Sequence, residues 1–159
     1  MTVETWHVAE QALMGMDLKY GRQILAALLP VCLTVAFHGV GIDQVHRFFK
    51  RFGRPVMRGP HRPARTAVIV GAVLILLLSH FFGIVIWASF YFVTGLLKDY
   101  SHAMVYSMNA YSTMGASNIY LGKGWLGFDN FETITSMLMF GWSTAVLADI
   151  VQKLHNLDD

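Results

Sequence analysis

Three long hydrophobic runs, separated by polar segments, dominate the pattern of the chain. The first run, residues 23–42, is uncharged and has the length of ~20 residues that matches a bilayer core. The second, residues 66–97, is also uncharged, and as one straight helix it would measure ~48 Å. We therefore expect it to be a tilted helix that extends beyond one membrane face. The third, residues 131–151, has acids only near its ends, and the pattern as a whole predicts three transmembrane helices.

Residues 103–121 have a different character, because they are uncharged but rich in small and polar side chains. Their first part, AMVYSMNAYS, would form a helix of ~15 Å, which is too short to cross a bilayer. Gly115 and further polar residues follow it. Non-helical backbone at membrane depth is tolerated only where it is buried in protein or lines a water-filled cavity. We therefore expect a re-entrant helix followed by a loop.

The polar segments on either side of the first run differ in charge. Residues 1–22 mix apolar, polar and charged positions, which predicts an amphipathic helix at the membrane interface or against the protein. Residues 43–65 contain seven of the twelve Lys and Arg residues and a single acid, Asp43. The positive-inside rule makes this segment a cytoplasmic connector. It places the N-terminus and the entry of the re-entrant loop outside, and the C-terminus in the cytoplasm.

Composition narrows the possible classes of protein. Of the 159 residues, 55% are hydrophobic and 14% are charged, which is typical of an integral membrane protein. We expect a multi-pass protein of the cell inner (plasma) membrane. The basic connector would also suit anionic lipid headgroups, whereas nucleic acid is not an expected partner. The chain lacks a phosphate-binding loop, an H-E-x-x-H motif and paired cysteines, so we expect neither an enzyme nor a cofactor.

The order of segments in residues 66–154 is specific. In order, this stretch contains SHFFGIVIWASFYFVTGLL, the short helix, STMGASNIY and FGWSTAVLADIVQKL. This order resembles the tetrameric potassium-channel superfamily, and in particular small bacterial members with an extra N-terminal span. Its members carry a pattern close to T-T-V-G-Y-G-D where STMGASN stands here. The resemblance implies an all-α fold, with three transmembrane helices plus a re-entrant pore helix and filter loop per subunit, assembled as a homotetramer.

The resemblance also implies an ion filter with K⁺ or Na⁺ as the permeant ion. In such filters backbone carbonyls, here with the Thr113 hydroxyl, replace the hydration shell of the ion. Residues 113–115 would hold a monovalent cation, and the filter positions would be Thr113, Met114, Gly115, Ala116, Ser117 and Asn118. Ser117 stands where a glycine with positive φ is usual, at a cost of ~1–2 kcal/mol. Because Ala116 also replaces an aromatic and Asn118 an acid, we expect a widened outer filter with weak K⁺/Na⁺ discrimination.

The last span would line the cavity of such a channel. Its pore-facing row, by resemblance, is Met137, Phe140, Thr144 and Ala148. The same spacing also describes a packing stripe. Glu132 would either brace the pore loop through hydrogen bonds or face the outer vestibule. Asp149 would be either an exposed interfacial acid or one of four carboxylates at the inner mouth.

Two histidines, His38 and His80, lie in the middle of spans. Each is interpreted as a hydrogen-bonded packing residue or as a pH sensor. Relatives in the resembling superfamily often have a flexible glycine in this helix at the position where Ser136 stands here. Gly141 and Ser143 would still permit bending or close helix approach. The predicted function is passive conduction of monovalent cations. The alternative is a non-conducting scaffold or regulatory membrane subunit.

Overall fold

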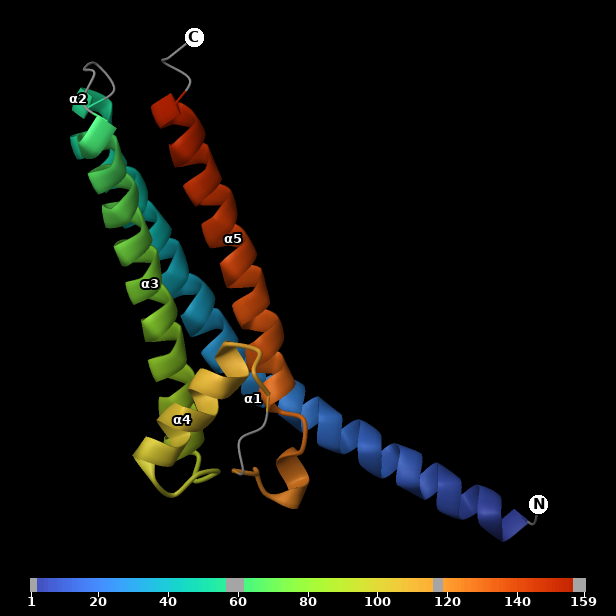
Figure 1. Ribbon diagram of the computed structural model, residues 1–159. Coiled ribbons are helices and arrows are strands. Elements are labelled where there is room, and N and C mark those ends of the chain that lie inside the picture. The colour runs from blue at the N-terminus through green and yellow to red at the C-terminus, as the bar shows by residue number, and fades with distance from the viewer. Residues whose placement is uncertain (1–2, 57–61, 116–118, 156–159) are drawn as a thin grey trace.

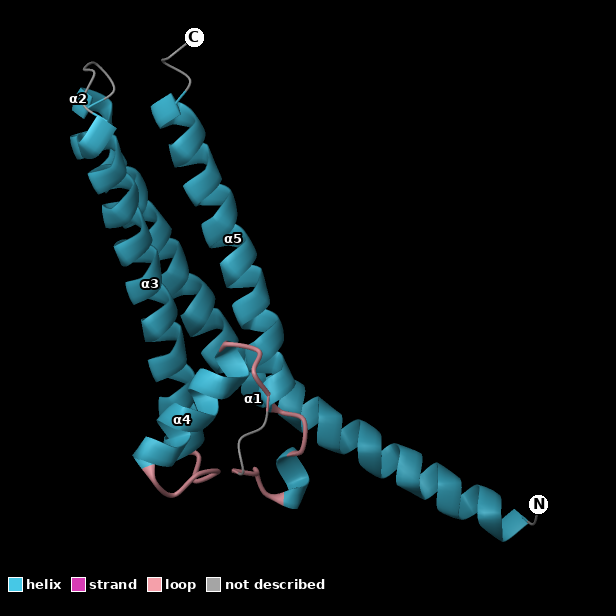
Figure 2. Ribbon diagram, in the orientation of Figure 1, coloured by secondary structure: helices cyan, strands magenta, loops and turns pink. Residues whose placement is uncertain are grey.

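The computed structural model describes residues 3–56, 62–115 and 119–155, and all regular structure in these ranges is helical (Figure 2). The helices are α1 (Val3–Phe48), α2 (Arg54–Val56), α3 (Arg62–Val93), α4 (Tyr100–Tyr111) and α5 (Asp129–His155). A π-helical turn, Phe49–Gly53, links α1 to α2, and a 3₁₀ turn, Lys123–Trp125, precedes α5. The described residues therefore confirm the predicted all-α class.

Three of these helices are long and apolar enough to cross a bilayer. The qualifying segments are Gly21–Val56, Pro63–Val93 and Asp129–Leu154. Figure 1 shows α3, α5 and the later part of α1 running along one another as an elongated bundle. Most of each span's surface is unburied, as expected for helices whose outer face meets lipid. Three spans of this kind agree with a multi-pass membrane protein.

Small residues let α1 and α3 approach closely at two points. A Cβ on Gly41 would lie 1.8 Å from the Ser79 hydroxyl oxygen, and one on Gly71 would lie 2.4 Å from the Phe48 ring. Close backbone approach through small residues is the usual way that helices associate in a membrane, because lipid offers no hydrophobic drive between them. The two contacts also fix the antiparallel register of α1 against α3.

Helix α1 continues through both boundaries drawn from the sequence, after residue 22 and after residue 42. Figure 1 shows that its N-terminal part leads away from the bundle and that the helix changes direction where it joins the other spans. Pro30 lies inside α1, and a proline removes one i→i−4 hydrogen bond and bends a helix. The N-terminal segment is thus an extension of the first span and does not fold back against the protein.

Helix α4 corresponds to the short helix predicted from AMVYSMNAYS, residues 103–112, but it begins three residues earlier, at Tyr100. It has twelve residues, so it is ~18 Å long and cannot cross a bilayer. The Asp99 side chain caps it by accepting a hydrogen bond from the His102 amide at 2.8 Å. Figure 1 shows α4 crossing the bundle at the end where α3 finishes and α5 begins. The segment therefore lies against the spans at one end of the bundle.

Candidate functional site

The Glu132 carboxyl group connects α4 to both neighbouring long helices. Glu132, in the first turn of α5, is 0% exposed and accepts two hydrogen bonds. One comes from the Tyr91 hydroxyl of α3 at 2.7 Å, and the other from the Ser107 hydroxyl of α4 at 2.5 Å. The bond to Ser107 is to the short helix itself, and a role for Glu132 in bracing a pore loop stays a prediction. This carboxyl group joins three helices at one point.

Further contacts hold the C-terminal half of α4. The Thr133 hydroxyl of α5 donates to the Ala110 carbonyl at 2.9 Å, and the Ser107 hydroxyl also lies 2.9 Å from the Ile84 carbonyl of α3. Tyr111 is buried against Gly83, where an added Cβ would lie 2.8 Å from the tyrosine ring and hydroxyl. The end of α4 is therefore held on two sides before the loop begins.

The loop after α4 begins with a tight C-terminal cap. The Met114 amide donates to the Asn109 carbonyl at 3.0 Å and the Thr113 amide to the Ala110 carbonyl at 3.1 Å, the two bonds of a Schellman motif. Thr113 takes the left-handed position with φ +62°, which glycine usually occupies, and Gly115 follows with φ +81°. Thr113 is the one non-glycine residue with positive φ in the described part of the chain.

The structure describes the first three of the six predicted filter residues. Thr113, Met114 and Gly115 are exposed at the end of α4, and the Met114 side chain is 81% exposed. Ala116, Ser117 and Asn118 lie outside the described residues. Their predicted part in an ion filter stays a prediction.

A chain of polar side chains crosses the middle of the bundle. His38 of α1 lies 3.0 Å from the Ser143 hydroxyl of α5, measured at Nε2, and the same hydroxyl lies 3.0 Å from Nε2 of His80 on α3. The other ring nitrogen of His80 lies 3.2 Å from the Tyr111 hydroxyl, at the end of α4. All four side chains are buried. Hydrogen bonds thus connect α1, α5, α3 and α4 in sequence.

The predicted cavity row lies on an unburied face of α5. Met137, Phe140, Thr144 and Ala148 are all exposed in the single chain. Phe140 also stacks on the His80 ring with centroids 4.4 Å apart, so this row borders the polar chain. Gly141 lies on the same face, with open space where a Cβ would stand.

Asp149 forms a surface ion pair with Lys153. The two side chains are one helical turn apart, their charged atoms are separated by 2.6 Å, and both are about half exposed. The carboxylate thus already has a cationic partner within its own helix. Either role considered for Asp149 stays a prediction.

Sequence reasoning missed Tyr91 and Ser107 as partners of Glu132, and Ser143 as the link between the histidines. The available signal was their chemistry, because a hydroxyl inside an apolar span usually has a hydrogen-bond partner. In the part of the chain that the structure describes, no three His, Cys, Asp or Glu residues gather into a group that would hold a metal ion. Comparisons with protein-family models, with curated proteins and with solved structures found no match.

Proposed function

We propose that the protein is a homotetrameric cation channel of the membrane, in which the loop after α4 forms the ion filter. The permeant ions are monovalent, K⁺ or Na⁺, and discrimination between them is weak. In this proposal α4 is the pore helix of a re-entrant segment, α3 is the outer helix and α5 the inner helix. Four copies of residues 113–118 meet around a common axis.

The observation that carries this proposal is the way α4 is held. A helix too short to span is fixed between two spanning helices by Glu132 and Thr133, and the exposed residues 113–115 follow its C-cap residue. Two of those three residues have positive φ, and alternation of backbone conformation of this kind turns successive carbonyl groups in different directions. Carbonyl oxygens presented in this way are the ligands that replace the hydration shell of a cation.

The unburied face of α5 supports the same proposal. Met137, Thr144 and Ala148 are exposed along one side of a helix whose other side packs against α1 and α3. In a tetramer this side would surround the pathway below the filter. The uncharged hydroxyl and methyl groups would leave a partly hydrated cation free to pass.

Flux into liposomes tests the proposal. Purified protein is reconstituted into vesicles that contain a thallium-sensitive dye, and thallium entry is compared with that of empty vesicles. Entry that depends on the protein supports the channel, and a vesicle that stays tight supports the alternative, a non-conducting scaffold. Met114→Trp places a large ring at an exposed loop position and is expected to reduce entry, whereas Leu25→Trp, at an exposed position of α1, is the matched control.

Planar-bilayer recordings in asymmetric K⁺ and Na⁺ test the selectivity. We expect a reversal potential close to zero when the two cations face each other at equal concentration. A reversal potential near the K⁺ equilibrium value would refute weak discrimination while leaving the channel in place. A tetramer is checked separately by the mass of the complex in lipid nanodiscs, where a monomer would contradict the shared axis.

A further inference from the structure

We propose that the basic end of α1 and the adjoining surface of α3 form a binding site for one anionic phospholipid. The lipid phosphate would lie against the guanidinium groups of Arg47 and Arg51, and an acyl chain would follow α3. The occupant is a lipid of the surrounding bilayer. This inference rests on the three membrane spans and is independent of ion conduction.

A hollow of about 510 Å³ lies between the two helices at this end. Gln44 and Arg47 of α1 and Arg51 of the π-helical turn that follows supply its polar side. Its apolar side is formed by Phe48 and Phe52 of the same segment and by Ile75 and Leu78 of α3. Two cations and an amide beside an apolar wall match a phosphate and glycerol region joined to a hydrocarbon chain.

The register of the helices places arginine and apolar surface at the same depth. The contact of Phe48 with Gly71 places the end of α1 beside α3, where Leu74 and Leu78 are exposed. Val70 is also exposed, so apolar surface extends over ~12 Å between Val70 and Leu78. A headgroup layer is roughly 5–7 Å thick on each face of a bilayer. Arg47 and Arg51 therefore lie close to apolar α3 surface that lipid hydrocarbon can cover.

The charges around the hollow favour an anion. Arg47 is paired with Asp43 at 2.7 Å, but both side chains are more than half exposed, so the guanidinium has further donors to offer. Arg51 lies 5.4 Å above the Phe52 ring, which holds its stem against the apolar side. Helix α3 contributes no charged residue from 66 to 93, and on α5 the Asp149 carboxylate is already paired with Lys153. Asp43 is the competing anion.

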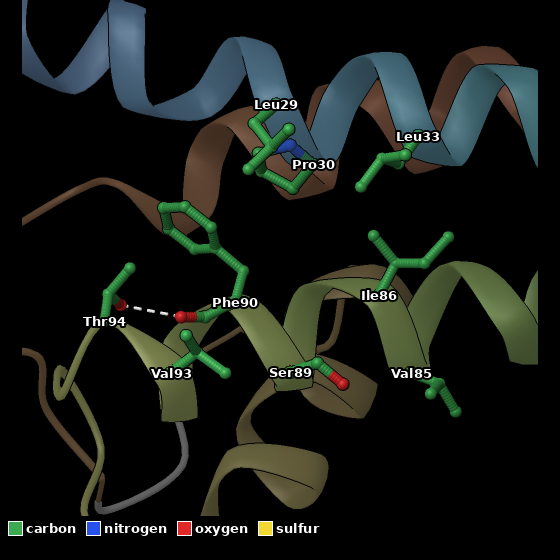
Figure 3. A pocket seen from close by; sticks show the side chains of 9 residues that line it. All are labelled: Leu29, Pro30, Leu33, Val85, Ile86, Ser89, Phe90, Val93 and Thr94. Atoms are coloured by element: carbon green, nitrogen blue, oxygen red, sulfur yellow. Dashed lines mark hydrogen bonds between the residues drawn. The ribbon is translucent and has the colours of Figure 1, made fainter.

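A second groove between the same helices has no such chemistry. Figure 3 shows this groove, with Leu29, Pro30 and Leu33 of α1 facing Ile86 and Phe90 of α3. Its volume is about 370 Å³ and its side chains include no charged group. That groove is therefore not assigned an occupant. The difference between the two grooves lies in Arg47 and Arg51.

Native mass spectrometry of the full-length protein, released from detergent at a fixed salt concentration, measures the binding. We titrate it with palmitoyl-oleoyl phosphatidylglycerol, with the matching phosphatidylcholine, and with the acyl-free headgroup glycerophosphoglycerol. We expect phosphatidylglycerol to bind at least ten-fold more tightly than phosphatidylcholine, and the acyl-free headgroup not to compete. Equal binding of the two lipids, or full competition by the free headgroup, would overturn a phospholipid site.

Substitutions locate the site. The double change Arg47→Gln and Arg51→Gln is expected to weaken phosphatidylglycerol binding by about thirty-fold, at ~1 kcal/mol for each cationic side chain near the membrane surface. Arg54→Gln is the matched control, because Arg54 is exposed but does not line the hollow. We expect it to change binding less than three-fold. An equal loss for Arg54→Gln and Arg51→Gln would show diffuse attraction and overturn the site.

Two further variants keep the test decisive if the double variant does not fold. Asp43→Asn removes the competing carboxylate and is expected to tighten phosphatidylglycerol binding. Ile75→Trp fills the apolar side without altering charge and is expected to weaken it by ten-fold or more. Unchanged affinity in both variants would overturn the proposal.

Discussion

Replacing Glu132 by alanine tests how α4 is held in place. The substitution removes the acceptor shared by the Tyr91 and Ser107 hydroxyls, both of which are 0% exposed. Because both residues are buried, we expect solvent not to replace the lost bonds. The Ser107 hydroxyl retains the Ile84 carbonyl at 2.9 Å as a partner. The Tyr91 hydroxyl loses Glu132, the acceptor of its hydrogen bond.

The magnitude follows from these contacts. A buried polar group without a partner costs ~1–3 kcal/mol, and the cavity left by the side chain adds to that cost. Because Ser107 can turn to Ile84, we expect a total of about 2–4 kcal/mol for Glu132→Ala. At ~2–4 °C for each kcal/mol in a chain of this size, the melting temperature should fall by about 4–16 °C. Glu132→Gln keeps one carbonyl acceptor, so we expect a smaller decrease.

Thermal unfolding of the purified protein in detergent, followed by tryptophan fluorescence, measures the change. Asp149→Asn is the matched control, since it removes a carboxylate from the same helix but breaks only a surface i,i+4 pair worth ~0.3–0.5 kcal/mol. We expect that control to stay within about 2 °C of the wild type. If Glu132→Ala and Asp149→Asn lower the melting temperature equally, the carboxyl group does not anchor α4.

Three other substitutions probe neighbouring contacts by the same unfolding assay. Gly83→Ala should lower stability by ~1–3 kcal/mol, because its Cβ would overlap the buried Tyr111 ring, whereas Gly141→Ala has open space and should be neutral. Ser143→Ala should cost ~1–3 kcal/mol by removing the hydroxyl between two buried histidines, and an unchanged melting temperature would show that this hydroxyl is dispensable. Thr113→Gly should raise stability by about 1 kcal/mol by relieving the left-handed backbone, and a decrease would show that the hydroxyl contributes more than the strain costs.

The spans were predictable because their signal is local. Length and the absence of charge identify a helix that crosses a bilayer, whatever it packs against. The short helix was predictable because AMVYSMNAYS has too few residues to cross a bilayer and is followed by polar residues and Gly115. Boundaries were less predictable. A change from amphipathic to apolar residues near residue 22 alters the environment of a helix but does not end it, so α1 continues from Val3 to Phe48.

The candidate site was predictable in its parts but not in its connections. The sequence shows that Glu132 needs a partner, because a charged residue in a span is costly. It does not show that the partner is Ser107, because that depends on the side from which α4 packs. Ser143 has no local pattern that distinguishes it from other hydroxyls in the span. Its position between His38 and His80 results from the crossing of three helices, and such a crossing is set by contacts distant in sequence.

The polar chain gives α1 a physical connection to the loop that follows α4. Tyr111 is the last residue of α4, and its hydroxyl is the fourth group in the series that begins at His38 on α1. Apolar contacts between helices offer little specificity in lipid, so hydrogen bonds of this kind have a large part in fixing the position of α4. A double-mutant cycle on His38→Ala and Tyr111→Phe measures whether the two ends act together. Connected groups should show a coupling energy of ~0.5–3 kcal/mol in unfolding, whereas additive effects would mean that α1 and the end of α4 are energetically independent.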